Sequence, residues 1–203
     1  MIRLGLTGGL ASGKSTSLKI LQELGCKTIS SDDITRELMK SNKRLIEQLK
    51  LTFNCVDDNG VVDRKALGKL IFNDKKAKEK LESLTHPLVK LVRKEFFKKC
   101  EETGSQFVVC ETPLLFEKDL IAEFDYSIVI VAGLDIRIDR YIESGKGDQD
   151  KFFTITKNQF LDNQKISQAD FVIKNNGTKE QLKEKLENTL KEVLIKHQKK
   201  MTY

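Results

Sequence analysis

Tryptophan is absent from this chain of 203 residues, proline occurs only twice and cysteine only four times. The cysteines lie far apart and form neither a Cys-x-x-Cys pair nor a cluster with histidine, so we expect reduced structural residues and no metal site built on them. The longest apolar run, near residues 126–134, is far too short to cross a bilayer. The chain also begins directly on a strand pattern, which leaves no room for a signal peptide. We therefore expect a cytoplasmic protein without membrane contact.

Positively charged residues are only modestly in excess over negatively charged ones. Lys and Arg number 36 against 30 Asp and Glu, a formal net charge of +6. Lysine dominates, is interleaved with glutamate along helical segments, and lacks aromatic neighbours at the spacing of a base-stacking surface. The excess therefore favours a solvated surface with a pocket for a polyanionic small molecule over a nucleic-acid-binding protein. The length and the 39% hydrophobic content suit one α/β domain with room for an insertion.

Residues 8–15, Gly-Gly-Leu-Ala-Ser-Gly-Lys-Ser, form the strongest motif of the chain. They stand between a predicted strand at 2–6 and a predicted helix at 16–24, the setting of a phosphate-binding loop. Glycines let the backbone fold around a phosphate chain, with N–H groups and the helix N-terminus directed at the anion. Lys14 then reaches the β- and γ-phosphates, and Ser15 binds Mg²⁺. The alternative is a glycine-rich turn with a surface lysine, but the complete pattern favours nucleotide binding.

Acidic residues follow two further predicted strands. Asp32 and Asp33 come directly after the second strand, and Glu111 follows the third. Ligands of an open α/β sheet collect at the carboxyl ends of strands, so we expect the two aspartates to face the same crevice as the phosphate loop. One of them can instead cap the next helix. Glu111 stands where phosphate-loop enzymes place the group that orients Mg²⁺, usually through water.

The remaining pattern predicts an α/β fold with a parallel sheet flanked by helices. Further strands are expected at 26–30, 106–110, 126–131 and 169–173, with helices at 34–38, 43–53, 134–142 and near the C-terminus. The stretch 33–103 is almost entirely helical, so we expect a helical substrate subdomain inserted into a core of 1–32 and 104–203. Within that core, glycines precede a polar stretch, and we expect a lid at about 140–165.

Thr85-His86-Pro87 interrupts the helical pattern. We expect a break at this point, with Pro87 in the first turn of a new helix that runs through Phe96. A lone histidine in such a place is more often a capping or packing residue than a catalyst, so the residues alone assign no chemistry to His86.

Several motifs together resemble the dephospho-CoA kinase family. They follow one another along nearly the whole chain, at residues 7–16, 31–36, 60–64, 86–87, 113–117 and 169–177. The phosphate loop is common to many families, whereas the His-Pro and Pro-Leu-Leu-Phe-Glu motifs are far more specific. The resemblance implies a P-loop NTPase-type fold and the last step of coenzyme A biosynthesis. In that step ATP, with Mg²⁺, phosphorylates the 3′-hydroxyl of the ribose of dephospho-CoA.

The resemblance also implies roles for individual residues. Asp32 matches the catalytic aspartate, which accepts or orients the proton of the attacking hydroxyl, and Arg140 matches an arginine that neutralises the transferring phosphate, beside Lys14. Asp33 is left to cap its helix. The residues expected to contact ATP are Gly9, Ala11, Ser12, Gly13, Lys14, Ser15, Thr16 and Asn175. Those expected on the substrate side are Thr7, Asp32, Arg36, His86 and Glu117. Ser15 would bind the metal directly and Glu111 through water.

The chain departs from the family pattern in the lid. A second arginine is usual four residues after Arg140, where this chain has Ser144, and another is usual where it has Ile155. Glu111 replaces an aspartate, which keeps the charge on a longer arm. The lid is therefore expected to depend on lysines, which are point charges and not bidentate forks. The candidates are Lys146, Lys157 and Lys165, the last of which matches a basic position of the family.

Two other functions are compatible with parts of the sequence. One is a related kinase acting on a nucleoside monophosphate or on shikimate. The other is a nucleotide-dependent switch or a basic nucleic-acid-binding protein, but Asn175-Asn176-Gly177-Thr178 is not the Asn-Lys-x-Asp element of a guanine-specific switch. We expect a small-molecule kinase that is a monomer or a weak homo-oligomer and does not bind nucleic acid.

Overall fold

The computed structural model describes residues 1–157 and 159–201. The chain forms two units, one made of Met1–Thr28 with Cys100–Tyr203 and the other of Ile29–Lys99. The first unit contains the phosphate loop and the central strands, and the second is mainly helical. Within the described part of the chain, no helix is both long and apolar enough to cross a membrane.

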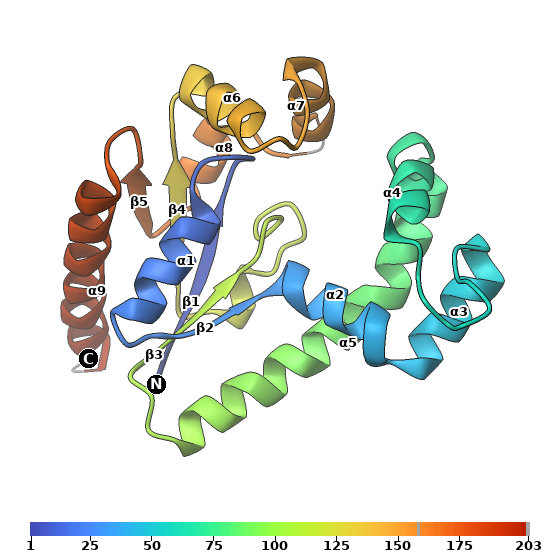
Figure 1. The fold of residues 1–203 in the computed structure, drawn as a ribbon. Helices are drawn as coiled ribbons and strands as arrows, with labels where there is room; N and C mark the ends of the chain where they lie inside the picture. Colours follow the sequence, from blue (N-terminus) through green and yellow to red (C-terminus); the bar gives the residue numbers. More distant parts are fainter. Residues whose placement is uncertain (158, 202–203) are drawn as a thin grey trace. The chain divides into compact units, whose positions relative to one another are not determined.

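The sheet has the strand order β2-β3-β1-β4-β5 (Figure 1). Its strands are β1 (Ile2–Gly8), β2 (Lys27–Ser30), β3 (Phe107–Glu111), β4 (Tyr126–Val131) and β5 (Phe171–Lys174). β1 pairs in parallel with β3 and β4, and β4 pairs in parallel with β5. Leu6 lies opposite Glu111, and Gly8 lies opposite Ile130. The central strands therefore end together beside the loop that follows β1, and the predicted α/β class is confirmed.

Helices flank this sheet. Those of the first unit are α1 (Lys14–Glu23), α6 (Leu134–Glu143), α7 (Gln149–Thr156), α8 (Asp162–Ile166) and α9 (Lys179–Met201), with a short 3₁₀ turn at Ile121–Glu123. α6, α7 and α8 gather beyond the carboxyl ends of β1 and β4 (Figure 1). The lid predicted at about 140–165 thus contains two short helices.

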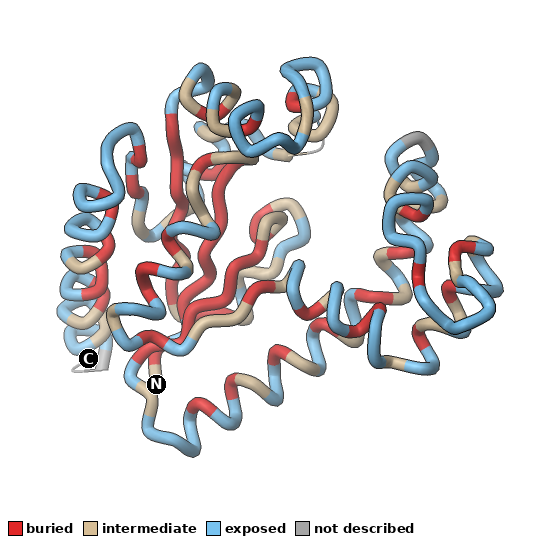
Figure 2. The backbone as a smooth tube through the Cα atoms, viewed as in Figure 1, coloured by how far each residue is buried: buried red, intermediate tan, exposed pale blue. Residues whose placement is uncertain are grey.

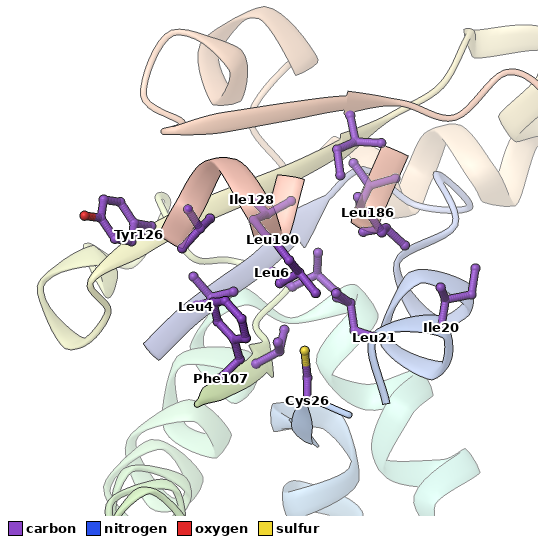
Figure 3. Close-up of a cluster of buried hydrophobic side chains, with 14 of the residues drawn as sticks. Leu4, Leu6, Ile20, Leu21, Cys26, Phe107, Tyr126, Ile128, Leu186 and Leu190 are labelled. Carbon is purple, nitrogen blue, oxygen red and sulfur yellow. The ribbon is translucent and has the colours of Figure 1, made fainter. Parts of the chain in front are cut away.

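The main core lies between the sheet and the pair α1 and α9. Leu4 and Leu6, two residues apart in β1, both belong to it, as the period of a strand requires. Leu186 and Leu190 of α9 meet them from the helix side (Figure 3). Apart from Arg3, the central strands are buried along their length, whereas the outer side of α9 is exposed (Figure 2). This rigid layer holds the two ends of the phosphate loop, which connects β1 to α1.

The second unit has its own hydrophobic core. Its helices are α2 (Ser31–Ser41), α3 (Lys43–Phe53), α4 (Arg64–Asn73) and α5 (Lys75–Glu102), the last of which continues into the first unit. Leu45 and Leu49 are completely buried in this core. A single antiparallel bridge joins Val56 to Val62. α3 has the predicted bounds.

The break predicted at Thr85-His86-Pro87 is wrong, because α5 runs through Pro87 without interruption. Proline inside a helix removes one backbone hydrogen bond and costs about 3 kcal/mol. Packing on both sides of the proline offsets this cost, since the apolar stripe of α5 continues into the core of the second unit at Leu81, Leu84, Leu88 and Val89. Thr85 Oγ1 also donates to the carbonyl of Leu81, at 2.9 Å.

The capping role expected for Asp33 is also wrong. α2 begins at Ser31 and not at Ile34, and Ser30 occupies the cap position. Asp33 lies inside the first turn, where its carboxylate pairs with the guanidinium of Arg36 one turn later. Negative charge in a first turn still stabilises the helix through its dipole.

All four cysteines are free and buried, as predicted. Burial raises the pKa of the Cys26 thiol to about 11. Burial also raises the pKa values of Cys55 and Cys100. Thiols with raised pKa values are poor nucleophiles, which fits a structural role.

Candidate active site

The phosphate loop folds into a tight turn that needs glycine at two places. Gly8 has φ +152°, and a Cβ there would lie 2.2 Å from the carbonyl oxygen of Ile130. Gly13 has φ +102°, and a Cβ there would lie 2.2 Å from Asn175 Nδ2. Ala11 adopts a left-handed conformation at φ 58°. A side chain at either glycine would collide with a neighbouring strand or loop, so the motif is required by the backbone.

Polar groups converge on the inside of this loop. Lys14 Nζ donates to the carbonyl oxygen of Gly9 at 2.9 Å. Ser12 is completely buried, and its hydroxyl has no hydrogen-bond partner among the described residues. A buried hydroxyl without a partner costs about 1–3 kcal/mol, so the loop fits a ligand that supplies an acceptor. A polyanion of the phosphate class meets this need, with the N-terminus of α1 beside it.

Asn175, expected to contact ATP, fastens the loop from the end of β5. Its amide donates to the carbonyl oxygen of Ser12 at 2.8 Å in a buried setting. The carbonyl of Asn175 accepts in turn from Arg140 Nη1 at 3.1 Å. Asn175 therefore links Arg140 of α6 to the phosphate loop, whose residues are predicted to bind ATP.

The neighbouring strand ends supply further polar groups. Thr7 is fully buried, and its hydroxyl donates to the carbonyl of Pro113 at 3.1 Å. Glu111 is 7% exposed and lies opposite Leu6, two residues before the loop. Ser15 is exposed at the start of α1. No group of three or more His, Cys, Asp or Glu side chains among residues 1–157 and 159–201 could hold a metal alone. A divalent ion here would therefore need oxygens from phosphate and water as well.

Arg137 is a site residue that the sequence did not indicate. It is 8% exposed, and its Nε donates to the carbonyl oxygen of Leu10 in the phosphate loop, at 2.8 Å. Gln159 accepts from the N–H of Leu10 at 3.2 Å. Arg137 lies three residues before Arg140 in α6, a spacing that puts both on one face but indicates no partner for Arg137. No local signal could have found these bonds, because they join residues more than a hundred positions apart.

Arg137 also lines a pocket of about 560 Å³ in the lid region. Its walls come from α6, α7 and the segment leading into α8, and they are mainly apolar. The lining residues are Leu134, Arg137, Phe152, Phe153, Thr156, Lys157, Gln159, Phe160, Leu161 and Asp162. Lys157 is therefore placed at a cavity, while Lys146 is exposed in the preceding turn.

Lys165 does not present a free charge to the lid, which corrects the expectation for this residue. It is completely buried, and its Nζ lies 2.5 Å from Glu117 Oε1. The same oxygen accepts from the N–H of Phe160 at 2.9 Å. Glu117 is itself 8% exposed in its side chain. The pair links α8 to the segment after β3, and each buried charge is matched by the other.

The second unit holds the remaining predicted residues. Asp32 is exposed in the first turn of α2. Arg36 pairs with Asp33 on the same helix. His86 is exposed on α5 beside Pro87. The roles of these residues in catalysis and substrate binding stay predictions.

The family model for dephospho-CoA kinase matches residues 2–181 of this chain. Dephospho-CoA kinase of Bartonella quintana is 36% identical over 193 residues, which cover 93% of this chain and 98% of that protein. Dephospho-CoA kinase of Fusobacterium nucleatum is 35% identical over 187 residues, covering 91% and 94% of the two chains.

Solved structures give the same picture at the level of the fold. A protein of Thermus thermophilus superposes with a TM-score of 0.81 at 30% identity, covering 96% of this chain and 97% of its own. Dephospho-CoA kinase from Campylobacter jejuni superposes with a TM-score of 0.68 at 28% identity, covering 94% and 96%. A shikimate kinase from Acinetobacter baumannii reaches 0.52 at 12% identity, with 97% and 94% covered, which shows a shared fold alone. The predicted P-loop kinase fold is confirmed.

Proposed function

Because this chain belongs to the dephospho-CoA kinase family, we propose that it transfers the γ-phosphoryl group of ATP to the 3′-hydroxyl of dephospho-CoA. The products are coenzyme A and ADP. The match of residues 2–181 to the family model carries the choice of acceptor. The phosphate loop supports the use of ATP, because its glycines leave no room for side chains and the buried Ser12 hydroxyl has no acceptor among the described residues. The alternative of a shikimate kinase has only a shared fold in its support.

In the proposed reaction the phosphate loop binds the phosphate chain of ATP. Gly9, Ala11, Ser12, Gly13 and Thr16 surround it through the backbone and the start of α1. Lys14 leaves the Gly9 carbonyl to contact the β- and γ-phosphates.

Arg140 and Asn175 form the neighbouring side of the nucleotide site. The guanidinium of Arg140 is anchored through one nitrogen to the Asn175 carbonyl, so its other nitrogens can offset charge that develops on the transferring group.

The site also fits Mg²⁺, held by the Ser15 hydroxyl and, through water, by Glu111. When bound, the ion would neutralise charge on the phosphate oxygens. Both side chains provide oxygen atoms, which are the ligands that Mg²⁺ prefers. Because Glu111 is fixed at the end of a buried strand, it presents its carboxylate with little loss of side-chain entropy.

Asp32 is proposed as the catalytic base. The ribose 3′-oxygen attacks the γ-phosphorus while the bond to the β,γ-bridging oxygen breaks, and the hydroxyl proton passes to the Asp32 carboxylate. Its exposure in the first turn of α2 leaves the carboxylate accessible to a substrate hydroxyl. Thr7, Arg36, His86 and Glu117 are proposed on the substrate side. The helical stretch 33–103, most of which falls in the second unit, Ile29–Lys99, is proposed as the substrate subdomain.

Two experiments test these proposals. Purified protein is given ATP, Mg²⁺ and one acceptor at a time, and we expect dephospho-CoA to be phosphorylated far faster than shikimate or a nucleoside monophosphate. Equal rates with another acceptor would refute the assigned substrate. Asp32→Asn should lower turnover by about 10²–10⁴-fold with ATP affinity nearly unchanged. Asp33→Asn, the matched control one residue along, should keep most of its turnover. Near-normal turnover in Asp32→Asn would exclude Asp32 as the base.

A further inference from the structure

Two consecutive peptide units of the phosphate loop are held by side chains from outside the motif. The unit that joins Gly9 to Leu10 has its carbonyl bound by Lys14 Nζ and its N–H bound by Gln159 Oε1. The next carbonyl, that of Leu10, accepts from Arg137 Nε. Once Lys14 turns toward a phosphate, Arg137 and Gln159 are the side chains that continue to hold this part of the loop.

Arg137 is well supported for such a task. Besides its bond to Leu10, its Nη1 lies 3.1 Å from Asp162 Oδ2. The guanidinium also lies over the ring of Phe152, 5.5 Å from the ring centre. Phe152 is completely buried, and the side chain of Arg137 is 10% exposed. A planar group held by two hydrogen bonds and a ring is fixed in direction, which a flexible ammonium would not be.

Gly9 is explained by the same contact. A Cβ at Gly9 would lie 2.4 Å from Arg137 Nη2 and 2.5 Å from its Cζ. Unlike Gly8 and Gly13, Gly9 does not have a positive φ, so its backbone conformation does not require glycine. The missing side chain leaves room for the guanidinium.

We infer that Arg137 and Gln159 are positioning residues that set the shape of the phosphate loop before the nucleotide binds. They act from α6 and from the lid segment (residues 140–165), so the lid is tied to the loop through the backbone of Leu10. Because the loop is already ordered, it loses less conformational entropy when ATP binds, and this raises the affinity for ATP. The inference rests on the proposed function only in that the loop binds ATP.

ATP titration calorimetry on the full chain tests the inference. Arg137→Ala should raise the Kd for ATP about tenfold, and Gln159→Ala, which removes one weaker bond, about threefold. Arg137→Lys should resemble Arg137→Ala, because an ammonium cannot contact Leu10 and Asp162 in the same fork. Asp139→Ala, an exposed change on the same helix, should bind like the wild type. Thermal melts without nucleotide identify any variant that is unfolded.

A double variant tests whether the glycine at position 9 acts through Arg137. In the wild type, Gly9→Ala should displace the guanidinium and raise the Kd for ATP about tenfold. In the Arg137→Ala background the same methyl group has room, so it should add less than about twofold. Equal effects of Gly9→Ala in both backgrounds, or unchanged ATP affinity in folded Arg137→Ala and Gln159→Ala, would overturn the inference. A wild type that binds no ATP would instead refute the proposed function.

Discussion

Replacing Lys165 by methionine should be among the most destabilising single changes in this protein. Methionine keeps the length of the apolar stem but removes the ammonium that lies 2.5 Å from Glu117 Oε1. Glu117 would then be a carboxylate with an 8% exposed side chain that accepts only the N–H of Phe160 from the partners described above. Its second oxygen, Oε2, already has no hydrogen-bond partner within the described residues. The change therefore leaves a buried charge that is almost uncompensated.

The expected loss is about 3–5 kcal/mol in the free energy of unfolding, the usual cost of removing one partner of a buried pair. A whole domain is stable by only about 5–15 kcal/mol. For a chain of this size the midpoint of thermal unfolding should fall by roughly 6–20 °C. Urea unfolding followed by circular dichroism measures the loss, and Lys157→Met, an exposed lysine of the same segment, is the matched control with an expected change within about 0.5 kcal/mol.

The double variant Lys165→Met/Glu117→Leu tests the reason for the loss. Because both charges are gone, most of the stability should return, although Phe160 loses its acceptor. The reasoning is refuted if Lys165→Met costs less than about 1 kcal/mol, or if the double variant is as unstable as the sum of the two single ones. Additive losses would mean that the two residues act independently and not as a pair.

Two further predictions concern other parts of the first unit. Gly13→Ala should lower the free energy of unfolding by about 1–3 kcal/mol because of its positive φ, and by about 1–3 kcal/mol more because it breaks the hydrogen bond from Asn175 to Ser12. Gly25→Ala, with φ +90° and open space around it, should lose only the first amount. Urea unfolding of both variants measures the difference. Burial raises the pKa of Asp170, but hydrogen bonds from Lys196 and Ser127 outweigh it, so its pKa is lowered on folding. The folded state therefore holds this proton less tightly. Asp170 should stabilise the fold above pH ~4, and this stabilisation should be lost as the pH falls through the folded pKa. Unfolding of Asp170→Asn and the wild type should thus converge in acid, and a constant gap down to the lowest pH would contradict this.

Local patterns were enough to predict the elements that dominate the core. The bounds of α3 and β4 agree with the periodicity of the sequence at both ends. These elements are determined by hydrophobic spacing over a few residues, which each segment carries by itself. The phosphate loop could also be predicted from a local motif, because Gly8 and Gly13 are required by their positive φ angles.

Local signals gave wrong predictions at Pro87 and at Asp33. Pro87 and the residues around it predicted a break, but apolar contacts on both sides keep α5 continuous. Aspartate is a common N-cap residue, but α2 begins two residues before Asp33, and Asp33 pairs with Arg36 inside the helix. Tertiary contacts decide the first case, whereas in the second the partner is local, because Arg36 lies one turn along the same helix.

The sequence by itself determined that this chain has a phosphate loop on a parallel sheet and belongs with the dephospho-CoA kinases, because both follow from the identity and order of residues. Only the tertiary structure decided the partners of the charged residues around that loop. Lys165 meets Glu117 from 48 positions away, and Arg137 meets Leu10 from 127. The sequence does not indicate which partner a charged side chain will have. Once the fold buries that side chain, the cost of removing its charge from water requires a partner.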